Sequence, residues 1–219
     1  MKRLNPSVYY PILLNIYQKK CVVVGGGEVA RRKVRALLER GAIIQVIAPT
    51  LCSELSQLVE SKAIDLLQRN FEPADLKDAR IVIAATAEAE TNRRVAMEAK
   101  RRGILVNVVD DPEHSDFIVP SCIHRGDLTI AISTAGKSPA LARKIRTRLE
   151  SDFGKEYLSL VKLIGEVRSE LKRRRVKVNA TIWQDALDLD QLIEMVRAGQ
   201  IEKAKTTLLN NLEKQVKGK

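Results

Sequence analysis

Two short segments hold residues whose types and spacing could do redox chemistry. The first reads Gly25-Gly26-Gly27-Glu28-Val29-Ala30 and fits the pattern G-x-G-x-x-A. Gly25 permits a tight turn, Gly27 lets a pyrophosphate approach the backbone, and Ala30 lets a helix pack closely on a strand. The N–H groups and positive end of that helix would hold the phosphates. The pattern predicts dinucleotide binding at Gly25, Gly26, Gly27, Glu28 and Val29; a glycine turn that only packs a helix onto a sheet is the alternative.

The second segment is the carboxylate pair Asp110-Asp111, which follows a buried strand at the end of the sheet where a nicotinamide ring would lie. A carboxylate there could accept a proton while hydride leaves the same substrate. On position alone, the pair is more typical of loop solvation or capping. By the same reasoning, Asn107 could simply satisfy backbone groups at this edge, and His114 is more typical of a surface loop than of a proton carrier.

A third candidate is the loop from Ser133 to Ser138, which contains hydroxyls, a glycine and a lysine directly before a predicted helix. Ser138 is expected to be the N-cap and Pro139 the first helical residue. Ser133, Thr134, Gly136 and Lys137 would then form a cradle for an anion. An ordinary capped helix start is the alternative that the sequence leaves open.

Strands and helices alternate along the first half of the chain and would position these segments. Buried strands are expected at 21–24, 43–48, 64–67, 80–85 and 105–109, with helices at 29–40, 53–60 and 91–101. Ser53 is expected to cap the second of these helices. The alternation predicts an α/β fold with a Rossmann-type, doubly wound parallel sheet, which binds dinucleotides at the carboxyl ends of its strands.

After Pro112 the pattern changes. Short strands are expected at 117–120 and 128–133, joined through a turn at Arg125-Gly126-Asp127. Helical spacing then continues from Pro139 and from Tyr157, and again over 187–198 and 201–212. The sheet is therefore expected to be followed by a small α+β segment and a C-terminal helical domain.

Composition excludes several classes of protein. The chain has 219 residues, 45% hydrophobic and 30% charged, as a soluble globular protein does. No apolar run approaches the roughly 18 residues that span a bilayer, and the run at 12–14 is too short for a signal peptide, so a cytoplasmic location is expected. Three scattered cysteines and two histidines form neither a disulfide framework nor a zinc pattern, so no metal site is expected.

The charge balance favours anionic partners. Lys and Arg number 38 against 27 Asp and Glu, a formal net charge of +11. Nucleic acid, a membrane surface and a polycarboxylate substrate all fit this excess. Only 4% of residues are aromatic and none interleaves with a basic run, unlike a base-stacking surface. The run Lys172-Arg173-Arg174-Arg175 is typical of a solvated face, or else of a rim that attracts anions.

One expected dinucleotide feature is missing. Nicotinamide sites usually place a carboxylate at the end of the second strand to hold the ribose hydroxyls, but here that strand ends Ile47-Ala48-Pro49-Thr50. Backbone groups and Thr50 would have to substitute. Arg31 and Arg32 could meet a 2′-phosphate, so the residues alone leave NAD and NADP both open.

Together these segments resemble one family, the precorrin-2 dehydrogenases of sirohaem synthesis, including the dehydrogenase/ferrochelatase part of the trifunctional sirohaem synthase. The matching motifs occur in family order and cover most of residues 8 to 150. They are Tyr10-Pro11-Ile12, the segment 22–33, Ala48-Pro49, and the segments 83–86, 107–110, 117–121 and 131–139. The C-terminal third is similar only in its helical character and basic content.

The resemblance implies NAD-dependent oxidation of precorrin-2 to sirohydrochlorin. It implies that Asp110 is the catalytic acid/base residue, which reverses the interpretation from position alone. NAD is expected at Gly25 to Val29, Pro49, Thr50, Ala85 and Thr86. The substrate is expected at Asn107, His114, Ser133, Thr134, Gly136, Lys137 and Arg143.

The resemblance also implies three regions: an NAD-binding domain over 1–112, a dimerisation and substrate segment over 113–150, and a C-terminal helical domain over 151–219. The expected partners are a polycarboxylate tetrapyrrole, which suits the cations Lys137 and Arg143, and a second copy in a homodimer. Nucleic acid and membrane are not expected.

Three alternatives stay open. The chain could also insert metal, or it could be a sirohydrochlorin ferrochelatase with a vestigial NAD site. The basic C-terminus suggests a non-catalytic regulator that senses NAD or binds nucleic acid, although no helix-turn-helix or RNA-binding signature supports it.

Overall fold

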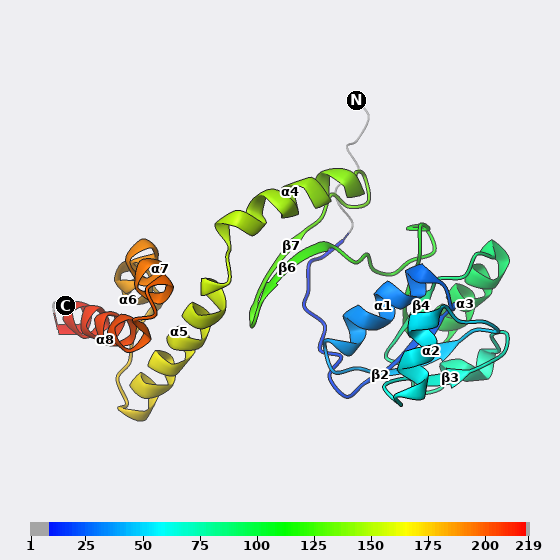
Figure 1. Ribbon diagram of the computed structural model, residues 1–219, viewed down its shortest axis with the longest axis horizontal. Helices are drawn as coiled ribbons and strands as arrows, with labels where there is room; N and C mark the ends of the chain where they lie inside the picture. The colour runs from blue at the N-terminus through cyan, green and yellow to red at the C-terminus, as the bar shows by residue number, and fades with distance from the viewer. Residues whose placement is uncertain (1–8, 218–219) are drawn as a thin grey trace. The chain divides into compact units, whose positions relative to one another are not determined.

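The structure is a computed structural model that describes residues 9–217. The chain divides between Val119 and Pro120 into two compact units (Figure 1), each described by itself below.

The first unit is built on a five-stranded parallel sheet. Its strands are β1 (Lys20–Val24), β2 (Ile43–Ile47), β3 (Asp65–Leu67), β4 (Ile81–Ala84) and β5 (Leu105–Val108). Its helices are α1 (Glu28–Leu38), α2 (Ser53–Glu60), the 3₁₀ turn η1 (Pro73–Leu76) and α3 (Ala89–Arg101). The strand order is β3-β2-β1-β4-β5, and all neighbours are parallel. The predicted Rossmann-type sheet is therefore confirmed.

Burial on both faces explains why the strands are continuous apolar runs. In β1, Cys21 and Val23 belong to the core that contains α1 and α2. Val22 and Val24, which point to the opposite face, belong to the core that contains α3. Burial raises the pKa of the Cys21 thiol to about 11, so this cysteine stays protonated, as an ordinary core residue does.

The strand order reverses direction at β1 and β4. Helices leave the sheet on opposite sides of this point, which opens a crevice at the carboxyl ends of the two strands. β1 ends at Val24, directly before the glycine turn, and β4 ends at Ala84, directly before Ala85 and Thr86. The fold therefore brings together segments that are about 60 residues apart in the sequence.

Two local predictions were wrong. Residues 117–120 form no strand, because the segment before them is bonded to the edge of β5: the Asp116 N–H donates to the Val106 carbonyl at 2.8 Å, and the Asn107 amide donates to the Phe117 carbonyl at 2.9 Å. Ser53 does not cap α2, since its hydroxyl donates to the neighbouring carboxylate of Glu54 and Cys52 occupies the N-cap position.

The second unit begins with an antiparallel hairpin of β6 (Ser121–Arg125) and β7 (Leu128–Ile132). The predicted turn between them is confirmed, with Gly126 at φ +60°. Helix α4 (Pro139–Asp152) packs on both strands (Figure 1). The predicted cap is also confirmed, because the Ser138 hydroxyl accepts the Leu141 N–H at 3.2 Å and Pro139 follows it.

Four further helices share a core of their own. They are α5 (Glu156–Arg173), α6 (Ala180–Ala186), α7 (Leu189–Arg197) and α8 (Ile201–Lys217). Leu160, Leu163, Val167 and Leu171 form the buried stripe of α5, at the three- and four-residue spacing of an amphipathic helix. Helix α6 was not predicted; Asn179 caps it by accepting the Ile182 N–H at 2.9 Å. None of the helices described is long and apolar enough to cross a bilayer.

Candidate functional site

A cleft of about 700 Å³ opens at the carboxyl ends of β1, β2, β4 and β5. It is lined by the glycine turn, by the loops that follow β2 and β4, and by the end of β5. All the residues predicted to bind the cofactor line it: Gly25, Gly26, Gly27, Glu28, Val29, Pro49, Thr50, Ala85 and Thr86. Asp110 lines the same cleft. The structure therefore places the predicted acid/base residue beside the predicted dinucleotide turn.

The glycines of the turn differ in what surrounds them. Gly25 has φ +128°, and a Cβ there would lie 2.4 Å from the Ala85 carbonyl oxygen. A Cβ on Gly26 would lie 1.9 Å from the Thr50 carbonyl oxygen. The Gly26 carbonyl in turn accepts the Cys52 N–H at 2.8 Å. Gly25 and Gly26 are thus required by neighbouring backbone of the protein itself, which the sequence did not reveal for Gly26.

Gly27 faces open space instead. No atom lies within 4 Å of the position that its Cβ would take, and its backbone is extended, as any residue allows. It is the N-cap of α1, whose first-turn N–H groups have no partner within the helix. A side-chain-free surface beside a positive helix end is what a pyrophosphate needs. The residues present therefore fit a dinucleotide.

The loop after β4 is fixed by a buried amide that the sequence analysis missed. The Asn92 side chain, on α3, accepts from the Thr86 hydroxyl at 2.8 Å and from the Thr86 N–H at 3.2 Å. Its own amide donates to the Thr86 carbonyl at 3.1 Å. Asn92 is 8% exposed, so these bonds are shielded from water. Asn92 therefore positions the cleft wall at Thr86, and nothing in the sequence between them signals this pairing.

A second missed feature is the wall that follows β3. Arg69, Asn70 and Phe71 line the cleft there. The Arg69 guanidinium donates to both carboxylate oxygens of buried Asp75, at 2.9 and 2.6 Å. Burial alone would raise the pKa of Asp75, but the bonds from Arg69 and from the Glu72 N–H lower it overall. The bidentate geometry fixes the orientation of Arg69 at the cleft.

Asp110 sits in a strained turn at the end of β5. Its φ is +59°, a left-handed conformation that few residues other than glycine adopt. The turn is held in place because the Val109 N–H donates to the Ala84 carbonyl at 2.9 Å. Asp110 itself is exposed. Strain of this kind, held by the surrounding structure, is typical of functional positions.

A lysine on α1 interacts with this carboxylate. Burial lowers the pKa of Lys33, the adjacent Arg32 lowers it further, and Asp110 raises it. Lys33 and Asp110 are therefore close enough to interact electrostatically. Lys33 carries no signal of this role in the sequence, because it comes near Asp110 only once α1 lies against the sheet.

Asp111 and His114 form a separate, local arrangement. The His114 ring nitrogen lies 2.8 Å from the Asp111 carboxylate, and the His114 N–H donates to the same carboxylate at 3.2 Å. The bond to His114 lowers the pKa of Asp111. His114 does not line the cleft. Its predicted role in substrate binding stays a prediction.

Asn107 is engaged in holding the edge of the sheet. It is buried, and its amide donates to the Phe117 carbonyl at 2.9 Å. Asn107 therefore satisfies a backbone carbonyl group at this edge of the sheet, which is one of the two roles considered for it from the sequence. A contact with substrate, which the resemblance implies for Asn107, stays a prediction.

The predicted anion loop belongs to the second unit. Ala135 and Gly136 have φ +52° and +82°, and the Thr134 hydroxyl accepts the Ser138 N–H at 2.9 Å. The Ser133 hydroxyl accepts the Ala135 N–H at 3.0 Å. Lys137 and, on α4, Arg143 are exposed. The loop is thus held in one shape with its cations in solvent.

One cluster of ligand-type side chains lies beside the cleft. In the described part of the chain, Glu28, Cys52 and Glu54 bring potential donor atoms within 4.8 Å of one another. Glu28 already pairs with Arg31 at 2.7 Å, which occupies one of the two cations considered for a 2′-phosphate. Ser53 donates to Glu54. The expectation that the protein holds no metal stays a prediction.

Comparisons with known proteins agree with this geometry. Residues 12–121 match the family model described as "Putative NAD(P)-binding", and residues 125–152 match "Sirohaem biosynthesis protein central". The chain is 41% identical over 207 residues to a sirohaem synthase of Photorhabdus laumondii, covering 94% of this chain and 44% of that protein. It is 44% identical over 182 residues to a sirohaem synthase of Chromobacterium violaceum, covering 82% of this chain and 39% of that protein.

Among solved structures, the precorrin-2 dehydrogenase SirC is similar, with a TM-score of 0.68 and 25% identity. The match covers 94% of this chain and all of SirC. The chain therefore belongs to the NAD(P)-binding family of sirohaem synthases and precorrin-2 dehydrogenases, as its motifs indicated. It spans less than half the length of the curated sirohaem synthases that it matches.

Proposed function

We propose that the chain catalyses the NAD-dependent dehydrogenation of precorrin-2 to sirohydrochlorin in the cytoplasm. The observation that carries this proposal is the position of an exposed, strained Asp110 in the same cleft as the open face of Gly27. Dehydrogenation removes a hydride from one atom of the substrate and a proton from another, so it needs a dinucleotide and a base within reach of the same bound substrate.

The first unit supplies the groups for both tasks. Bound NAD would supply the acceptor for hydride. The glycine turn and the start of α1 would hold its phosphates, and the wall at Thr86 would orient its nicotinamide half. Asp110 would accept the proton released as hydride leaves the substrate.

The substrate class follows from charge. A tetrapyrrole with many carboxylates suits the exposed cations Lys137 and Arg143 of the second unit. We propose that these two residues, with the hydroxyls of the 133–138 loop, bind substrate carboxylates. The +11 net charge would also speed the encounter with an anionic substrate.

The decisive experiment is anaerobic incubation with precorrin-2 and NAD, followed by the absorbance of reduced nicotinamide. Asp110→Asn should retain NAD binding and lose turnover by at least about a hundredfold, a typical contribution of general base catalysis. Glu113→Gln, which removes a neighbouring exposed carboxylate, is the matched control and should be unchanged. Normal turnover by Asp110→Asn would remove its proposed role.

Two further arms separate the alternatives. Incubating sirohydrochlorin with ferrous ions and no NAD tests for metal insertion, which the resemblance leaves open. Salt-sensitive binding of DNA or RNA, with no turnover of any tetrapyrrole, would instead favour a regulator.

We also propose that the chain forms a homodimer through the 113–150 segment. Leu141 and Ile145, four residues apart on α4, are 51% and 37% exposed and lie next to each other on the surface of the helix. Leu141→Glu with Ile145→Glu should convert a dimer to a monomer in analytical ultracentrifugation. A monomeric unmodified protein at micromolar concentration would contradict the proposal.

A further inference from the structure

A second concave site lies in the second unit, among its C-terminal helices. It is a groove of about 700 Å³ between the second half of α5, the connection 174–179 and the start of α6. Its volume falls within the range of roughly 300–1,000 Å³ that is usual for small-molecule sites. Nothing in the proposed dehydrogenation uses this groove.

The floor of the groove is apolar and aromatic. Ile164, Val176, Val178 and Trp183 are only partly buried there, although they pack against the helical core. Trp183 presents a large flat surface that can stack on a planar ligand. A floor of this kind favours a ligand with an apolar or conjugated body.

The rim of the groove is cationic. Arg168, Lys172 and Lys177 line it, and no Asp or Glu is among the lining residues that the structure describes. Among the residues that the structure describes, none of these three cations forms an ion pair. The groove therefore carries uncompensated positive charge beside an apolar floor.

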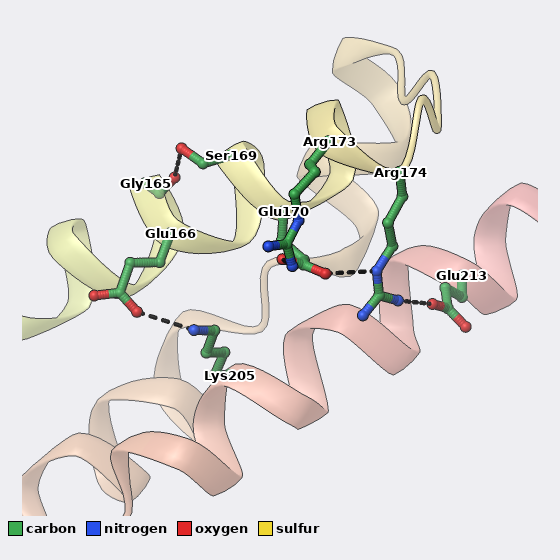
Figure 2. A network of polar contacts seen from close by, with 8 residues as sticks. All are labelled: Gly165, Glu166, Ser169, Glu170, Arg173, Arg174, Lys205 and Glu213. Atoms are coloured by element: carbon green, nitrogen blue, oxygen red, sulfur yellow. Dashed lines mark hydrogen bonds and ion pairs between the residues drawn. The ribbon is translucent and has the colours of Figure 1, made fainter.

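Three cations near the groove, Arg173, Arg174 and Lys205, pair with carboxylates instead of lining it. Figure 2 shows Glu170 between Arg173 and Arg174, with Arg174 reaching Glu213 of α8 at 3.3 Å. It also shows Lys205 of α8 donating to Glu166 at 3.0 Å. Carboxylates of α5 and α8 therefore engage Arg173, Arg174 and Lys205, and none of them pairs with the three cations at the rim.

We propose that this groove binds a polycarboxylate tetrapyrrole at a site separate from the dehydrogenase cleft. The macrocycle would lie against Trp183, and its carboxylates would reach Arg168, Lys172 and Lys177. The identity of the ligand rests on the proposed function, since that function supplies a molecule with a conjugated ring and many carboxylates. A groove with a single aromatic side chain fits one macrocycle better than a nucleic-acid strand, which needs an extended track of stacking residues.

Fluorescence can test the groove directly, because Trp183 is the only tryptophan in the 219-residue chain. Uroporphyrin, a stable octacarboxylate porphyrin, is the probe, and a tryptophan amide solution corrects for its light absorption. Titration of the full chain should quench the emission saturably, and added salt should weaken the binding.

Lys172→Glu with Lys177→Glu should weaken uroporphyrin binding by at least about tenfold, because two attractive contacts become repulsive. Lys203→Glu with Lys214→Glu, exposed positions of α8 outside the groove, changes the net charge equally and should leave binding within about threefold. Melting curves of both variants establish that they fold.

A third variant tests whether porphyrin bound elsewhere quenches Trp183 at a distance. Lys137→Glu with Arg143→Glu should leave the quenching curve unchanged. Loss of quenching in this variant would refute the proposal that the groove binds uroporphyrin. Unchanged quenching in the Lys172→Glu, Lys177→Glu protein would refute it as well. Stronger quenching by a single-stranded oligonucleotide than by uroporphyrin would overturn the assignment of its ligand.

Because these curves need neither NAD nor turnover, the two proposals fail separately. NAD reduction without uroporphyrin quenching would support the proposed dehydrogenase activity and refute the proposed binding in the groove. Saturable quenching without NAD reduction would support the proposed binding in the groove and refute the proposed dehydrogenase activity.

Discussion

Replacing Gly27 with aspartate should separate the stability of the protein from its affinity for NAD. The Gly27 backbone is extended, and its missing side chain faces empty space, so the fold can accept a larger residue there. Aspartate is also a better N-cap than glycine by a few tenths of a kcal/mol, and a negative charge near a helix N-terminus is favourable by about 0.3–1 kcal/mol. The variant should therefore melt at the same temperature as the unmodified protein or slightly above it.

Affinity should change in the opposite direction. The new carboxylate would point into the cleft that is expected to hold the pyrophosphate. Two like charges about 5 Å apart repel by about 3 kcal/mol at an effective dielectric constant of about 20. A loss of that size corresponds to roughly a hundredfold weaker NAD binding.

Isothermal titration calorimetry with NAD and thermal melting by circular dichroism measure the two effects on the same sample. Gly27→Ala is the graded control, because a methyl group intrudes into the cleft without adding charge. If Gly27→Asp melts normally and still binds NAD within about threefold of the unmodified protein, the pyrophosphate does not lie at the start of α1 and the reasoning is refuted.

Three other substitutions test the supports of the cleft. Gly26→Ala should lower the free energy of unfolding by about 1–3 kcal/mol in urea denaturation, because its Cβ would overlap the Thr50 carbonyl; unchanged stability would contradict this. Asn92→Ala should lower the free energy of unfolding by about 2 kcal/mol, since buried polar groups of Thr86 lose their partner, and it should weaken NAD binding. Asn210→Ala, at an exposed position of α8, is the control. The lowered pKa of Asp75 makes the free energy of unfolding sensitive to acid. Its stabilising contribution is complete above the ordinary carboxyl pKa of 3.8 and is lost as the pH falls below that value. Asp75→Asn should remove this part of the acid sensitivity. Urea titrations at neutral and acidic pH measure this loss, and an equal acid sensitivity in Asp75→Asn would contradict it.

The parallel sheet could be predicted because its signal is local and repeated. The central strands β1 and β4 are short apolar runs buried on both faces, and an amphipathic helix follows each of them. Such runs need no knowledge of their neighbours to be recognised. The hairpin turn at Gly126 and the cap at Ser138 were predictable for the same reason, since both depend on adjacent residues.

The errors arose where distant groups decide the local structure. Residues 117–120 are as apolar as a strand, but the segment leading into them is bonded to β5. Helix α6 spans only 7 residues and is stabilised chiefly by packing on α8, so its own sequence carries little periodic signal. The hydrogen bonds that hold the cleft walls were not predicted for a similar reason. The partners of Thr86 and Arg69 are the side chains of Asn92 and Asp75, which belong to no characteristic motif.

The glycine turn shows how far a motif can be interpreted without coordinates. Gly26 and Gly27 are adjacent and identical in kind, and the sequence assigned both to the cofactor. The structure separates them, since Gly26 is required by the Thr50 backbone and Gly27 by nothing within the protein. A residue that the fold does not need, at a helix N-terminus that opens on a cleft, is explained best by a ligand. This contrast gives Gly27, rather than the motif as a whole, the strongest claim to a functional role.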